Sequence, residues 1–162
     1  SIKHFGKAGE VLKNTLIMWE KLVKESPIMY EEYLAMAYNN LGDLFRETNR
    51  FDEAKETYIK AIMIREKLVK DNPVVYENDL AASYNNYGKL LRAMKCYVEA
   101  EFEYKKAIAI RERLATDYPA VYESDLATSY DNLGELLRET GRFVEEEILK
   151  KAEKMQKNKK FV

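Results

Sequence analysis

The chain has 162 residues, of which 46% are hydrophobic and 34% charged, and its formal net charge is −1. This composition allows a buried core, and no apolar stretch approaches the ~18 residues that a transmembrane helix needs. The near-zero net charge gives no general attraction to nucleic acid or to an anionic membrane. We therefore expect neither a nucleic-acid partner nor a membrane partner. The single cysteine, Cys96, has no intramolecular disulfide partner, which favours a reducing, cytoplasmic setting.

One five-residue motif occurs three times, and it reads Tyr-Asn-Asn-Leu-Gly in its first copy. The glycines of the three copies are 46 residues apart (88 − 42 and 134 − 88), and so are the three prolines: Gly42, Gly88, Gly134, Pro27, Pro73 and Pro119. A fixed period in the range of about 20–50 residues predicts a stacked repeat architecture. Strand-like alternation of apolar and polar residues is missing, so the predicted fold class is all-α.

Each repeat predicts two helices, which we name A and B in chain order. The A helices are expected near 27–47, 73–93 and 119–139, and the B helices near 52–70, 98–116 and 144–158. Residues 1–25 fit the pattern of a further B helix without its A helix, and residues 159–162 form a short tail. The expected arrangement is one domain of about seven helices, with repeats at 27–70, 73–116 and 119–158.

Helix boundaries follow from proline, glycine and asparagine. Proline suits the first turn of a helix, where its missing N–H is not needed. The A helices are expected to end at Asn49, Lys95 and Gly141, where a left-handed residue terminates the helix. Lysine is the least suited of the three to that conformation, so we expect the middle turn to be the least regular.

Apolar residues at helical spacing predict the core. In the first A helix this stripe is Leu34, Ala37, Tyr38, Leu41 and Phe45. The facing stripe of the B helix is Ala54, Tyr58 and Ala61, repeated as Ala100, Tyr104 and Ala107. Gly42 sits within the A stripe although a mid-helix glycine costs about 1 kcal/mol relative to alanine. Its recurrence predicts a close approach of the paired B helix.

These residues resemble the tetratricopeptide repeat family, whose pattern is matched by Tyr38, Leu41-Gly42, Phe45, Ala54, Tyr58 and Ala61 and by their second copies. The third copy departs from it at Glu146 and Lys150. The period of 46 residues exceeds the family's 34 by 12. In this longer period the chain is similar to kinesin-light-chain-type repeats. The segment Ala61-Ile62-Met63-Ile64-Arg65-Glu66 and its copy at 107–112 are similar to those repeats as well. The resemblance implies a right-handed α-solenoid that binds a peptide or a partner helix on its concave face.

The polar face of the A helices carries the candidate binding residues, which are Asn39, Asn40, Asp43, Arg46, Asn85, Asn86, Lys89, Arg92, Asp131, Asn132, Glu135 and Arg138. Asparagine side chains donate and accept hydrogen bonds and so match a peptide backbone, and arginine holds carboxylates in a bidentate geometry. The alternative is that the asparagines bond neighbouring helices and the arginines pair with adjacent repeats. In that case both rows would only set the spacing of the stack.

The sequence argues against an enzyme. With one histidine, His4, and one cysteine, neither a nucleophilic triad nor a zinc site can be assembled, and we expect no cofactor and no metal. The predicted function is therefore a protein-interaction scaffold. The alternatives are a module that self-associates into a homo-oligomer through exposed repeat ends, and a regulatory module of a larger protein.

Overall fold

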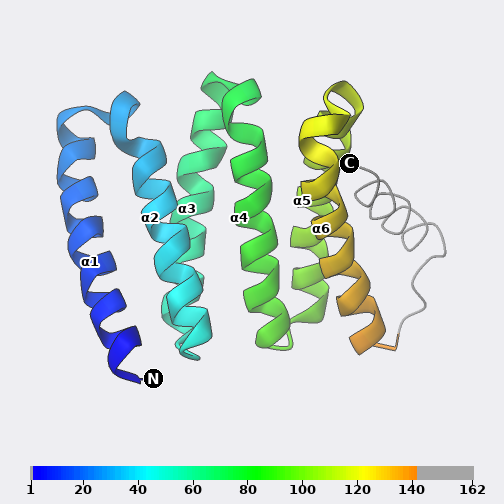
Figure 1. Ribbon diagram of the computed structural model, residues 1–162, viewed down its shortest axis with the longest axis horizontal. Helices are drawn as coiled ribbons and strands as arrows, with labels where there is room; N and C mark the ends of the chain where they lie inside the picture. Colours follow the sequence, from blue (N-terminus) through cyan, green and yellow to red (C-terminus); the bar gives the residue numbers. More distant parts are fainter. Residues whose placement is uncertain (1, 142–162) are drawn as a thin grey trace. The chain divides into compact units, whose positions relative to one another are not determined.

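The computed structural model describes the backbone of residues 2–141 and the side chains of residues 10–141. Within these residues six α-helices follow one another without a strand (Figure 1). Their bounds are α1 Ile2–Glu25, α2 Pro27–Glu47, α3 Phe51–Asp71, α4 Pro73–Ala93, α5 Tyr97–Asp117 and α6 Pro119–Glu139. The A helices α2, α4 and α6 thus have the predicted bounds, and the B helices α3 and α5 differ from theirs by one residue at each end.

The fold is an all-α repeat solenoid, as predicted, and it divides into two compact units whose boundary falls inside α4. In the unit Ser1–Asn86, α2 packs against both α1 and α3. In the unit Tyr87–Val162, α5 packs against α6. The seventh predicted helix, 144–158, lies outside the described residues. The right-handed sense of the solenoid and the single domain stay predictions.

The turns between A and B helices follow one hydrogen-bonding scheme. Asn49 has φ 58° and Lys95 has φ 61°, so both occupy the left-handed region that was expected to end the A helices. In each turn the left-handed residue and the residue after it donate their N–H groups back to the last helical turn, at 2.8–3.1 Å. This is the Schellman arrangement. The expectation of a less regular middle turn was wrong, because Lys95 adopts the same geometry despite its side chain.

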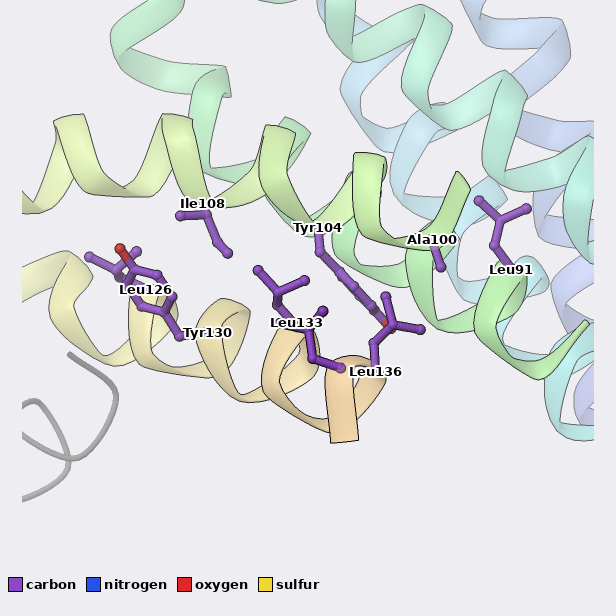
Figure 2. Packing of buried hydrophobic residues seen from close by; sticks show 9 residues of the cluster. Leu91, Ala100, Tyr104, Ile108, Leu126, Tyr130, Leu133 and Leu136 are labelled. Carbon is purple, nitrogen blue, oxygen red and sulfur yellow. The ribbon is translucent and has the colours of Figure 1, made fainter. Parts of the chain in front are cut away.

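The predicted core stripes are buried. Leu34, Ala37, Tyr38, Leu41 and Phe45 of α2 all face the interior, and the tyrosines and alanines of the B stripes are fully enclosed. Figure 2 shows the second unit, where Tyr104 reaches from α5 toward Leu133 and Leu136 of α6. Large tyrosine rings between small alanines allow the facing helices to interdigitate.

The motif glycines allow the B helix to approach closely. A Cβ added to Gly42 would lie 2.7 Å from Cε1 of Tyr58, and one added to Gly88 would lie 2.6 Å from Cε1 of Tyr104. Both rings are completely buried and so have little room to move. The predicted reason for the glycines is therefore confirmed in these two repeats.

Replacing Gly42 with alanine should destabilise the protein by about 1–3 kcal/mol, because the overpacking strain outweighs the gain in helix propensity. Denaturant unfolding of the variant measures the loss. In a Tyr58→Ala background the same substitution should cost less, since the ring that it meets is gone. An equal loss in both backgrounds would contradict the clash.

Replacing Lys95 with glycine should stabilise the protein by about 1 kcal/mol, because an L-residue is strained in the left-handed region and glycine is not. The midpoint of thermal unfolding checks this. Asn49→Gly is the matched control in the other turn, and its gain should be smaller, since asparagine tolerates this conformation better than lysine does.

Candidate functional site

Two adjacent residues of a B helix hold two adjacent residues of the following A helix. Arg65 of α3 donates through Nη1 to the backbone oxygen of Asp79 at 3.0 Å and to Oγ of Ser83 at 2.9 Å. The neighbouring Glu66 accepts a 2.6 Å hydrogen bond from the hydroxyl of Tyr84. An Arg-Glu pair on α3 thus fixes a Ser-Tyr pair on α4.

The second unit repeats this arrangement. Arg111 of α5 donates to the backbone oxygen of Asp125 at 2.9 Å and to Oγ of Ser129 at 2.8 Å. The hydroxyl of Tyr130 donates to the carboxylate of Glu112. Both arginines are buried, with 4% and 5% of their surface exposed for Arg65 and Arg111. The junction between a B helix and the next A helix therefore depends on directional polar contacts.

The junction between α1 and α2 keeps half of this arrangement. The hydroxyl of Tyr38 donates to Glu20 at 2.7 Å, as Tyr84 does to Glu66. The arginine position is held by Trp19, whose ring stacks on Tyr33 with centroids 5.0 Å apart and planes 13° apart. The first junction thus keeps the polar contact of the tyrosine and has an aromatic contact where the later ones have an arginine.

The two asparagines of the first motif copy face different surroundings. Asn39 is buried, and its Nδ2 donates to Oγ of Ser83 on α4 at 2.8 Å. Its Oδ1 has no hydrogen-bond partner in the described chain. Asn40, one position further along α2, is exposed. Asn39 therefore spaces the A helices, as the alternative interpretation of the row held, while Asn40 remains accessible.

Two charged candidates of α2 are engaged within their own unit. Asp43 accepts a 2.7 Å hydrogen bond from the hydroxyl of Tyr58. Nη2 of Arg46 lies 3.4 Å from Asp43 and 3.7 Å from Glu47, in a half-buried position. Burial, together with the hydrogen bond to Asp43, raises the pKa of the Tyr58 phenol above its ordinary value.

In the second unit one arginine of the row, Arg92, pairs with the next A helix. Nη1 of Arg92 lies 2.6 Å from Glu135, and its Nε lies 2.9 Å from Glu139, which also accepts a hydrogen bond from Tyr97. This is the pairing that the alternative interpretation expected. Of the remaining candidates, Asn85 is buried, Arg138 is exposed, and the half-buried ones are Asn86, Lys89, Asp131 and Asn132.

Arg65 also connects α3 back to α2. Its Nη2 lies 2.6 Å from Oε1 of Glu32, and its Nε donates to the other carboxylate oxygen at 3.3 Å. Burial raises the pKa of the Glu32 carboxyl above its ordinary value, and the hydrogen bond and charge of Arg65 lower it only in part. Arg65 therefore links its own helix α3 to both α2 and α4.

Sequence reasoning did not assign a role to Arg65 or Ser83. The signal was present, because Arg65, Ser83 and their copies Arg111 and Ser129 share the 46-residue period (111 − 65 and 129 − 83). A buried arginine needs acceptors at matching positions. Searching the period for polar pairs as well as apolar ones would have found this contact.

No helix among the described residues is long and apolar enough to cross a membrane. In the same part of the chain, no three histidine, cysteine, aspartate or glutamate side chains gather as they would to hold a metal ion.

Replacing Arg65 with methionine should destabilise the protein by about 3–5 kcal/mol, because it leaves a partly buried carboxylate and buried oxygens without their donor. Chemical denaturation measures the loss. Adding Glu32→Gln should recover part of it, since the unpaired charge is removed. Arg50→Met, which breaks an exposed ion pair with Glu53, is the control and should cost much less. Equal losses for the two arginines would contradict the role of the buried contact.

Among known protein families, the model of the tetratricopeptide repeat matches residues 35–68 of the chain. This stretch runs from α2 through the first A–B turn into α3 and contains Gly42, Tyr58 and Arg65. No curated protein sequence matches the chain.

Among solved structures, the chain is similar to BtubC (BKLC) from P. vanneervenii, with a TM-score of 0.78 and 24% sequence identity. The alignment covers 98% of this chain and 59% of the other, so the chain spans little more than half the length of that protein. At this identity the similarity shows the fold alone. Residues 35–68 thus match the tetratricopeptide repeat model, in a chain whose helix pairs have the fold of an all-α repeat solenoid.

Proposed function

We propose that the chain is a protein-interaction scaffold that holds a peptide segment or a partner helix against the polar face of its A helices. Tetratricopeptide repeats generally mediate protein–protein interaction, and residues 35–68 form one. The observation that carries the proposal is the difference between Asn39 and Asn40. The first is buried in a helix–helix contact, and the second lies exposed beside it.

This arrangement supports binding because it presents a free amide on a rigid support. Asn39 is tied to Ser83, which Arg65 also contacts, so the α2 backbone around Asn40 is held by packing and hydrogen bonds. An exposed amide has both a donor and an acceptor to offer to an extended peptide backbone. Sites on helices with fixed neighbours hold their geometry better than sites on loops.

An apolar strip leads along α2 to Asn40. Met29, Tyr33 and Met36 are 61%, 47% and 45% exposed, and they precede Asn40 at spacings of four, three and four residues. These positions share one face of the helix. Methionine and tyrosine are enriched in protein interfaces, where they provide adaptable apolar contact area. The partner therefore presents apolar side chains next to free backbone amides. Binding involves no covalent or catalytic step.

A phage-displayed peptide library panned on the chain tests this proposal. The selected peptides should bind the wild type, and their affinity should fall about tenfold or more when Asn40 and Asn86 of the first unit are both replaced by alanine. Isothermal titration calorimetry measures the affinities. Asn14→Ala removes an exposed amide from α1 and serves as the control. If no peptide is selected, or if the double variant binds as tightly as the wild type, the proposal fails.

A further inference from the structure

Arg65 and the two acidic residues around it leave one negative charge unpaired. Arg65 directs its Nε and Nη2 to the carboxylate of Glu32 on α2. Its Nη1 binds the backbone oxygen of Asp79 and Oγ of Ser83 on α4, so none of these hydrogen bonds reaches the Asp79 carboxylate. Asp79 is half-buried and forms no ion pair with any described residue. The junction therefore contains one guanidinium and two carboxylates, of which only Glu32 is paired.

The two carboxylates lie close enough to affect each other. Burial raises the pKa of the Glu32 carboxyl above its ordinary value, and the negative charge of Asp79 acts in the same direction. The acidic neighbour Glu31 is already paired, because Nζ of Lys67 lies 2.6 Å from its Oε1. A carboxylate that is taken partly out of water without a cation of its own costs stability. The packing of the chain thus gives no reason for the charge of Asp79.

The second carboxylate is particular to this junction. In the next repeat the position of Asp79 is again an aspartate, Asp125 (79 + 46), and the arginine recurs as Arg111 (65 + 46). The position of Glu32, however, is the neutral Asn78 (32 + 46). The repeat can therefore be built with one acidic residue for each arginine. Departures from an otherwise consistent pattern are expected at functional positions.

Asn39 adds an unpaired acceptor to the same hydrogen-bond network. It is 6% exposed, and its Nδ2 donates to Oγ of Ser83, the oxygen that Nη1 of Arg65 also binds. Its Oδ1 has no hydrogen-bond partner in the described chain. A buried polar atom without a partner calls for a further group, such as a water, an ion or a ligand. The junction thus has a surplus of acceptors as well as of negative charge.

We propose that Glu32 and Asp79 together bind a basic side chain of the partner, a lysine or an arginine. This inference rests on the proposed function and specifies the partner further. The side chain of Glu32 is 26% exposed, and the adjacent Tyr33, which is 47% exposed, belongs to the apolar strip that leads to Asn40. Lysine and arginine lay their aliphatic stems along apolar surface while the charged group reaches an acidic partner. The recognised segment therefore combines a basic residue with apolar side chains.

The peptides selected from the displayed library test this inference. Those selected on the wild-type chain should share a lysine or an arginine, which should be missing after selection on the Asp79→Asn chain. Replacing that residue of a selected peptide with glutamine should weaken binding to the wild type about tenfold, and binding to the Asp79→Asn chain much less. Isothermal titration calorimetry of the four combinations forms a double-mutant cycle, in which the two losses should not add.

Asp125→Asn is the matched control, because it removes the corresponding aspartate of the second unit, and it should leave the affinity unchanged. Thermal unfolding separates recognition from a structural role. Asp79→Asn should leave the unfolding midpoint unchanged or raise it, since the charge that it removes has no ion-pair partner in the described chain.

The outcomes separate this inference from the proposed function. Selected peptides without a shared basic residue, equal losses from the two asparagine variants, additive losses in the cycle, or a lowered unfolding midpoint for Asp79→Asn would each overturn the inference and leave the proposed function standing. If no peptide is selected at all, both fail.

Discussion

The contact between a buried tyrosine ring and a glycine governs both A–B helix pairs that the structure describes in full. Tyr58 lies so close to Gly42 that a single added carbon would overlap it, and Tyr104 stands in the same relation to Gly88. The ring fills the space between α2 and α3, and its hydroxyl reaches on to Asp43 at 2.7 Å. One side chain thus provides both the apolar packing of the pair and a polar contact that orients it. The small alanines beside the ring are buried because this contact brings the two helices together.

Successive pairs are joined by a different kind of contact. Arg65 and Glu66 together bind a serine, a tyrosine and a backbone oxygen of α4, and Arg111 and Glu112 do the same on α6. Apolar packing tolerates small rotations, whereas a buried guanidinium with several acceptors accepts one geometry. The apolar contact therefore sets how close two helices of a pair lie, and the polar contact sets how the next helix is oriented. The exposed face of the A helices takes its geometry from both.

Much of the fold could be predicted because the 46-residue period repeats the same apolar stripe, glycine and proline in each copy. The helix bounds and the buried residues of α2 and α3 follow from that repetition. The candidate site was harder to predict, because Asn39 and Asn40 are neighbours on one polar face and nothing in the local sequence distinguishes them. The partner that buries Asn39 is Ser83, on another helix and 44 residues away (83 − 39). The turn at Lys95 was misjudged for a related reason, since the backbone hydrogen bonds of the turn outweigh the local preference of the residue.

At the first junction Trp19 holds the position that Arg65 holds at the next one. This difference affects which substitutions each junction can accept in evolution. At the junction of α3 with α4, one arginine contacts Glu32, Asp79 and Ser83, so a substitution at any one of them strands the others. At the junction of α1 with α2, the stacked rings of Trp19 and Tyr33 make no directional demand on a third residue. Apolar side chains of similar size can replace one another there one at a time. The Trp19 position is thus freer to diversify in evolution than the Arg65 position, which changes only by coordinated substitutions.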